Sequence, residues 1–229
     1  MRLGIVGAGR MGKILAQSLS KAFDVVIFDS NTAGMKKVSA ELGLSAVESL
    51  TALEVERIIL AVPDGAVRGC VEELTRQGVT ASVFNVATNT SRDELAAMAG
   101  DKLRCLNVKI IGHAGEMERG AEPAIVVDEG ETETVQQALE IFQCVGCTLV
   151  GDADAVRKIN ICATEAALKA AVALEEALCN NGIADPRLIK AALSQVATGV
   201  LRAYAEDDLG PFAWGIVCAL RDKSDGKMV

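Results

Sequence analysis

Residues 1–16 read MRLGIVGAGRMGKILA. An apolar run from Leu3 to Val6 leads directly into three glycines, Gly7, Gly9 and Gly12. After the glycines, apolar side chains recur at the spacing of one helix face, at Ile14, Leu15 and Leu19. The stretch therefore predicts a β-strand, a glycine turn and an α-helix in immediate succession.

The same alternation of strand and helix patterns continues to about residue 151. Strands that are apolar on both faces are expected at Val25–Phe28, Arg57–Val62, Ser82–Ala87, Cys105–Ile111, Ala124–Val127 and Cys147–Val150. Helices are expected at Thr32–Leu42, Ala66–Arg76, Arg92–Met98 and Glu133–Phe142. This order predicts a doubly wound, Rossmann-type α/β domain over residues 1–151, with a parallel sheet covered on both faces.

A small all-helical domain is expected over residues 152–229. Its first helix is the alanine-rich stretch Ala155–Cys179, which ends at Asn180–Gly182. A second helix runs from Pro186 to about Tyr204, and a third begins at Pro211. The first helix is apolar nearly all round, so we expect it to be buried against the sheet domain or a second subunit. A homodimer through the helical domain is the simpler explanation.

The composition of the chain excludes some classes of binding partner. The net charge of −8 and the absence of a Lys/Arg cluster argue against nucleic acid. No apolar run reaches the roughly 18 residues of a membrane span, and the N-terminus enters a strand without a signal-peptide pattern, so we expect a cytoplasmic protein that does not bind membranes. Seven cysteines, an odd number, are expected to be reduced thiols packed as small apolar groups, without a disulfide.

The glycine spacing is that of a dinucleotide-binding turn. In such a turn Gly7 permits the tight bend, Gly9 lets a pyrophosphate approach bare backbone, and Gly12 allows close packing of helix and strand. The helix N-terminus adds N–H groups and partial positive charge for the phosphates. The residues expected to bind the cofactor are Gly7, Ala8, Gly9, Arg10, Met11, Gly12, Asp29, Ser30, Val62, Pro63 and Thr88.

Asp29 indicates which dinucleotide is preferred. It ends the second strand, 20 positions after Gly9, where a carboxylate can accept hydrogen bonds from both ribose hydroxyls. This favours NAD, because a 2′-phosphate would meet the carboxylate, whereas Lys36 and Lys37 leave NADP open. The alternative is a glycine turn made for packing alone, with Asp29 as a capping residue on the surface.

Several motifs together resemble two related families of enzymes. They are IVGAGRMG at residues 5–12, AVPD at 61–64, NVAT at 85–88 and NVKIIGHAGEMERG at 107–120. With the alanine-rich helix that follows Arg157-Lys158-Ile159-Asn160, they resemble the β-hydroxyacid dehydrogenases and pyrroline-5-carboxylate reductases, which belong to the two-domain, 6-phosphogluconate-dehydrogenase-like superfamily. The resemblance implies an NAD(P)-dependent oxidoreductase acting on a small carboxylate.

The chain departs from both families at their substrate motifs. The serine that β-hydroxyacid dehydrogenases use for substrate falls at Ile111, and their second loop glycine falls at His113. The Ser-Gly-Ser-Gly-Pro run of the reductases is missing at residues 160–164, which read NICAT. The substrate therefore stays open.

Hydride transfer also needs a proton donor or acceptor. His113 is the only histidine and follows a strand end. A histidine side chain suits proton transfer because its ordinary pKa lies near neutrality. Lys158 lies where related dehydrogenases carry their catalytic lysine, and the cation that is not the acid could hold a substrate carboxylate. Asn160 could orient that carboxylate. Cys144 and Cys147 have redox or metal spacing, but no second pair completes a site, so we expect core cysteines and no metal.

Three functions follow from the sequence. The first is hydride transfer between a nicotinamide and a carbonyl, imine or hydroxyl carbon of a small carboxylate, as in β-hydroxyacid dehydrogenases. The second is an imine reductase resembling pyrroline-5-carboxylate reductase. The third, from another class, is an NAD-sensing or partner-binding protein that has lost catalysis.

Overall fold

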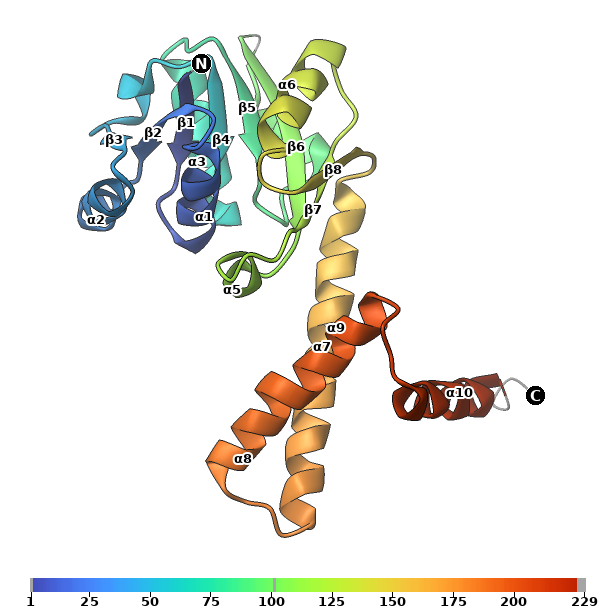
Figure 1. Cartoon of the computed structure of the whole chain (residues 1–229). Helices are drawn as coiled ribbons and strands as arrows, with labels where there is room; N and C mark the ends of the chain where they lie inside the picture. The colour runs from blue at the N-terminus through green and yellow to red at the C-terminus, as the bar shows by residue number, and fades with distance from the viewer. Residues whose placement is uncertain (1, 101, 226–229) are drawn as a thin grey trace. The chain divides into compact units, whose positions relative to one another are not determined.

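A computed structural model describes residues 2–100 and 102–225 of the chain (Figure 1). The chain divides into two compact units, Met1–Cys162 and Ala163–Val229. This division falls within one long helix, α7 (Asp154–Asn180). The domain boundary expected from the sequence, between residues 151 and 152, lies just before that helix and stays a prediction.

The first unit is built on one eight-stranded sheet. Its strands lie in the order β3-β2-β1-β4-β5-β6-β7-β8. Their bounds are β1 Arg2–Val6, β2 Asp24–Phe28, β3 Ser45–Ala46, β4 Arg57–Leu60, β5 Ala81–Asn85, β6 Leu103–Ile111, β7 Ala124–Val127 and β8 Cys147–Val150. The order reverses at β1, since β2 lies on one side of it and β4 on the other. The doubly wound arrangement is confirmed.

Helices cover both faces of this sheet (Figure 1). They are α1 Arg10–Leu19, α2 Thr32–Leu42, η1 Leu50–Leu53, α3 Asp64–Arg76, α4 Arg92–Met98, α5 Ala114–Met117 and α6 Thr132–Phe142. Alternate residues of β1 join different cores: Leu3 and Ile5 pack with α1, α2 and α6, whereas Val6 packs with α3, α4 and η1. Period-2 alternation of apolar residues thus produces two hydrophobic layers.

Two strands, β7 and β8, run against the predicted parallel direction. Strand β7 pairs antiparallel to β6, with Ile111 opposite Ala124, and β8 is parallel to β7. The connection over residues 112–123 carries only α5, a single turn of four residues. A parallel return would need a crossover that spans the length of the sheet, which one helical turn cannot supply. The prediction of an entirely parallel sheet is therefore wrong at β7 and β8, which both run opposite to the other strands.

The second unit contains most of α7 and the helices that follow it. These are α8 Pro186–Ala191, the π-helical turn η2 Ala192–Ala197, α9 Thr198–Ala205 and α10 Pro211–Asp225. The predicted break after α7 is present, with Gly182 in the left-handed region at φ 81°. Of the residues of α7, all of which the structure describes, only Val156 is buried. The burial expected for this helix is not provided by the residues that the structure describes.

The cysteines differ from the packing expected of them. Cys70 and Cys105 are half-buried, but Cys144, Cys147, Cys162, Cys179 and Cys218 are exposed, and all seven are free thiols. Cys144 follows the last turn of α6, and Cys147 begins β8, the edge strand of the sheet. Because an edge strand has a neighbour on one side only, its positions stay accessible. The prediction of core packing for the Cys144–Cys147 pair is wrong.

No helix in the described part of the chain combines the length and the hydrophobicity that crossing a bilayer requires. The cytoplasmic location expected from the sequence stays a prediction.

Candidate functional site

The glycine turn lies between β1 and α1, at the carboxyl edge of the sheet. Gly7 has φ 105°, and a Cβ added to it would come within 2.3 Å of the Ala61 carbonyl oxygen. A Cβ on Gly12 would lie 1.8 Å from the Gly7 carbonyl oxygen. Backbone cannot give way at such distances, so both positions require glycine. The tight bend expected at Gly7 and the close packing expected at Gly12 are both present.

Gly9 is different, because nothing in the protein explains its missing side chain. A Cβ on Gly9 would meet no heavy atom within 4 Å. Its backbone borders a cavity of about 420 Å³ at the point where the strand order reverses. In open α/β sheets this crevice is where ligands bind. The lining residues are Val6, Gly7, Ala8, Gly9, Phe28, Asp29, Ser30, Asn31, Gly34, Ala61, Val62, Pro63, Ala66 and Cys70.

Asp29 joins the end of β2 to the glycine turn. Its Oδ2 accepts a hydrogen bond from the Ala8 amide at 2.6 Å, and its Oδ1 accepts one from the Asn31 amide at 2.7 Å. These bonds fix the carboxylate on the cavity wall. The lining residues include no lysine or arginine, and Lys36 and Lys37 are exposed outside it. A second phosphate on the ribose would therefore face Asp29 without a compensating cation in the wall.

The first turn of α1 supplies the positive end of the helix dipole. Gly9 is the N-cap residue, no side chain caps the turn, and no acidic residue lies in it. Arg10 and Met11 begin the helix, but they are not among the residues lining the cavity. Of the other residues predicted to bind the cofactor, Ser30, Val62 and Pro63 line this cavity; Thr88 lines a second one.

The second cavity has about 410 Å³ and an ionic wall. It is lined by Thr88, Asn89, Ser91, Asp154, Arg157, Lys158 and Ile161. Two cations, Arg157 and Lys158, come from the first turns of α7, and the hydroxyl and amide groups come from the segment after β5. With the carboxylate of Asp154 also in the lining, the cavity offers a net positive charge and neutral hydrogen-bonding groups around one space. Lys158 and Thr88, predicted for different roles, are brought together here.

His113 and Asn160 lie near the end of β6. His113 is exposed as the N-cap residue of α5 and does not line either cavity. Asn160 donates from Nδ2 to the Ile110 carbonyl oxygen at 3.1 Å. This bond ties α7 to β6 and occupies the amide that we expected to orient a substrate.

Two residues at the site were missed from the sequence. Cys70, on α3, lines the first cavity, and burial followed by the nearby charge of Asp29 raises the pKa of its thiol. Lys109, on β6, is only 1% exposed, and burial lowers the pKa of its amine to about 8. A signal for Lys109 was present in the sequence, since it interrupts an otherwise apolar strand.

Among the described residues, no group of three or more His, Cys, Asp or Glu side chains is placed to hold a metal ion.

Comparisons with known proteins agree with this geometry. Residues 2–87 match the model of a family described as NADP oxidoreductase, coenzyme F420-dependent. No curated protein matches the chain in sequence. A pyrroline-5-carboxylate reductase from Coxiella burnetii superposes with a TM-score of 0.74 at 15% identity, over 99% of this chain and 91% of that one.

Two further solved structures are similar. A variant imine reductase from Myxococcus stipitatus, in complex with NAD+, has a TM-score of 0.65 at 17% identity over 90% of this chain and 77% of its own. A Mycobacterium tuberculosis 3-hydroxyisobutyrate dehydrogenase with L-serine has a TM-score of 0.64 at 18% identity, over 80% of this chain and 66% of its own. The resemblance seen in the sequence is confirmed at the level of fold: the chain is folded like these reductases and dehydrogenases, and its first 87 residues match an oxidoreductase family model.

Proposed function

We propose that the chain is an NAD(P)-dependent oxidoreductase that transfers a hydride between a nicotinamide and a carbonyl, imine or hydroxyl carbon of a small carboxylate. The observation that carries this proposal is the cavity beside Gly9. It lies at the reversal of strand order, next to an uncapped helix N-terminus, with the carboxylate of Asp29 fixed on its wall. The oxidoreductase family model over residues 2–87 supports it.

The residues present fit a dinucleotide. The bare backbone at Gly9 leaves room for a pyrophosphate, and the first turn of α1 favours its charge. Asp29 accepts hydrogen bonds, as ribose hydroxyls require, and its position favours NAD over NADP. When bound, the nicotinamide supplies or accepts the hydride.

The second cavity is the proposed place for the substrate. Arg157 holds the substrate carboxylate, and Lys158 moves a proton at Nζ to or from the oxygen or nitrogen of the reacting group. Thr88 offers a hydroxyl that can orient the same group. His113, near the same edge of the sheet, is the second candidate for proton transfer. Asn160 positions the start of α7 through its bond to Ile110.

A single added methyl group tests cofactor binding. In Gly9→Ala the new Cβ meets no protein atom, so the fold is retained, but it occupies the space proposed for the pyrophosphate. We expect NADH affinity, measured by fluorescence titration, to fall about tenfold or more. Gly69→Ala, on the exposed side of α3 with equally open space, is the matched control and should bind as the unmodified chain does. Equal affinity in both variants would refute the proposed cofactor site.

Turnover separates the candidate functions. The purified chain is assayed with NADH and NADPH against 1-pyrroline-5-carboxylate, and with NAD and NADP against 3-hydroxyisobutyrate. Lys158→Ala should lose turnover and keep NADH binding, and His113→Ala should do so if the histidine carries the proton. If both variants retain full activity, the assignment of the proton donor is wrong. NADH binding without turnover of any tested substrate would favour the nucleotide-sensing alternative.

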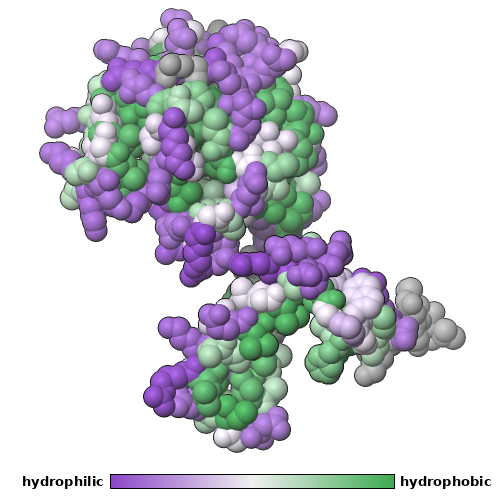
Figure 2. All heavy atoms as spheres, viewed as in Figure 1, coloured by the Kyte–Doolittle hydropathy of each residue, from purple (hydrophilic) through white to green (hydrophobic). Residues whose placement is uncertain are grey.

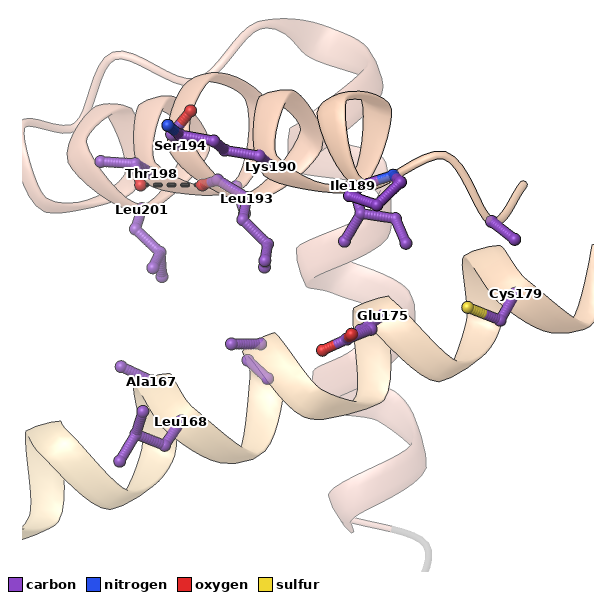
Figure 3. Close-up of a pocket in the computed structure, with 15 residues that line it drawn as sticks. Ala167, Leu168, Glu175, Cys179, Ile189, Lys190, Leu193, Ser194, Thr198 and Leu201 are labelled. Atoms are coloured by element: carbon purple, nitrogen blue, oxygen red, sulfur yellow. Dashed lines mark hydrogen bonds between the residues drawn. The ribbon is translucent and has the colours of Figure 1, made fainter.

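We also propose that the second unit pairs with a second copy of the chain. Figure 2 shows hydrophobic side chains at the surface of these helices, and they include Leu168 at 61% exposure, Val196 at 65% and Leu201 at 59%. Leu193 and Leu201, on the α8–α9 segment, point across a cavity of about 760 Å³ toward α7, whose Leu168 also lines it (Figure 3). Apolar surface of this extent marks an interface in a globular protein.

The oligomeric state is measured by light scattering after size exclusion. We expect a dimer for the unmodified chain and a monomer for Leu168→Glu, because a buried unpaired carboxylate opposes association. Leu149→Glu, at an exposed apolar position on β8 of the first unit, is the control and should remain dimeric. A monomer in the unmodified chain would refute the pairing.

A further inference from the structure

Three polar side chains form a buried row on one face of the sheet. Asn85 lies on β5, and Asn107 and Lys109 lie on β6, with Asn85 directly opposite Asn107. Lys109 is two residues beyond Asn107 and therefore points to the same face. All three are at most 1% exposed, in a layer that is otherwise apolar.

This row binds both backbone polar groups of one residue, Ala87. Asn85 Nδ2 donates to Asn107 Oδ1 at 2.9 Å, which leaves Asn85 Oδ1 to accept from the Ala87 amide at 3.1 Å. Lys109 Nζ donates to the Ala87 carbonyl oxygen. Ala87 lies beyond the last residue of β5, so side chains take the place of the ladder partners that it lacks.

The segment that follows Ala87 forms a wall of the second cavity. Thr88, Asn89 and Ser91 line this cavity together with Arg157 and Lys158. Asp64 accepts hydrogen bonds from the Asn89 amide at 2.7 Å and from Asn89 Nδ2 at 2.8 Å. This segment is therefore held at two residues: Lys109 binds the carbonyl of Ala87 at its start, and Asp64 binds Asn89.

A lysine is an expensive choice for this position. Burial disfavours its charge, and the carboxylates of Asp64, Asp154, Asp128 and Glu94 oppose that effect only in part. A methionine of similar length would fill the space without the cost of burying an ammonium. Retaining a costly buried group is expected where it serves a site and not the core.

We propose that Lys109 is a positioning residue of the substrate site: by holding the Ala87 carbonyl, it keeps Thr88 and Asn89 on the cavity wall that faces Lys158. This inference rests on the proposed function for the role of the cavity, but the clamp itself is a property of the unliganded protein. It involves none of the residues that line the cavity beside Gly9. Its loss should therefore affect substrate use and leave dinucleotide binding intact.

The test combines hydrogen exchange with kinetics. In Lys109→Met, peptides covering residues 86–91 should exchange about tenfold faster than in the unmodified chain, the factor expected for losing one hydrogen bond to a charged group. With 1-pyrroline-5-carboxylate as probe, kcat/KM should fall about tenfold, while the Kd for NADH stays within about twofold. Lys109→Gln, which keeps an N–H donor, should recover part of both losses.

Val108→Ala is the control for general destabilisation. Val108 is the fully buried neighbour of Lys109, and its side chain points to the opposite face. The control should lower the melting temperature without selective exchange at residues 86–91. The inference is refuted if Lys109→Met folds with unchanged exchange there, or if Val108→Ala produces the same selective change.

Two readouts keep the outcome decisive. If Lys109→Met does not fold, Lys109→Gln is compared with the unmodified chain instead. The shorter glutamine side chain should not fully replace the lysine as donor, so the clamp is overturned if residues 86–91 exchange at the same rate in both chains. If the unmodified chain binds no NADH, the proposed function fails, whereas the exchange experiment still decides whether Lys109 holds the segment.

Discussion

Replacing Lys109 by methionine should change the pH dependence of stability in a way that identifies the buried amine. Burial lowers the pKa of this amine from 10.5 to about 8 in the folded chain. Between these values the unfolded chain binds more protons than the folded chain, so the stability of the unmodified chain rises with pH. At about 1.36 kcal/mol for each pH unit, the amine costs about 3 kcal/mol of unfolding free energy at pH 7.

The cost shrinks as both states lose their proton. It falls to about 2 kcal/mol at pH 9 and to about 1 kcal/mol at pH 10 by the same linkage relation. Lys109→Met removes this term and also loses the bond to the Ala87 carbonyl, which costs about 1–3 kcal/mol at every pH. The difference between the two chains should therefore move by about 2 kcal/mol in favour of the unmodified chain between pH 7 and pH 10.

Urea unfolding followed by circular dichroism at pH 7, 8, 9 and 10 measures this difference. Lys102→Met, at an exposed position just before β6, is the control, and its difference from the unmodified chain should stay constant over the same range. A constant difference for Lys109→Met as well would show that the amine is not desolvated in the folded chain. The account of its burial would then be wrong.

Three other outcomes follow from the same structure. Gly12→Ala should destabilise the chain by about 1–3 kcal/mol in thermal unfolding, because its Cβ would lie 1.8 Å from the Gly7 carbonyl oxygen. Unchanged stability would contradict the packing of α1 on β1. Arg92→Ala should lower the free energy of unfolding, measured with urea, by about 2–3 kcal/mol, because it leaves the buried carboxylate of Asp128 without its ion pair. A decrease below about 0.5 kcal/mol would contradict this prediction. NADH should slow alkylation of Cys70, followed by mass spectrometry at pH 8, because the thiol lines the first cavity; equal rates with and without NADH would place the dinucleotide elsewhere.

The parts of the site that the sequence predicted are those set by neighbouring residues. The turn from Gly7 to Gly12 is encoded locally, because a positive φ and a close approach of helix to strand each demand glycine at a fixed spacing. Asp29 was predictable for a related reason, since β2 must pair beside β1 and ends where the turn begins. The structure places both on one cavity.

The parts that the sequence did not predict depend on contacts between distant segments. The second cavity joins the segment after β5 to the first turns of α7, about 70 positions later. The hydrogen bond from Lys109 to Ala87 joins residues 22 positions apart, and no periodic pattern of apolar residues in the sequence predicts it. The direction of β7 depends on the path of residues 112–123, and nothing in their composition excludes a parallel return.

The two cavities differ in a way that explains why the chain carries its charges where it does. The cavity beside Gly9 offers a helix N-terminus and one carboxylate, which suits a ligand with its own phosphates and hydroxyls. The second cavity carries Arg157 and Lys158 beside one carboxylate, Asp154, and this net positive charge suits a small anion with few other groups to recognise. In the function that we propose, the chain divides recognition of two different anions between two cavities, and Lys109 holds the segment after Ala87 in place without lining the cavity that this segment borders.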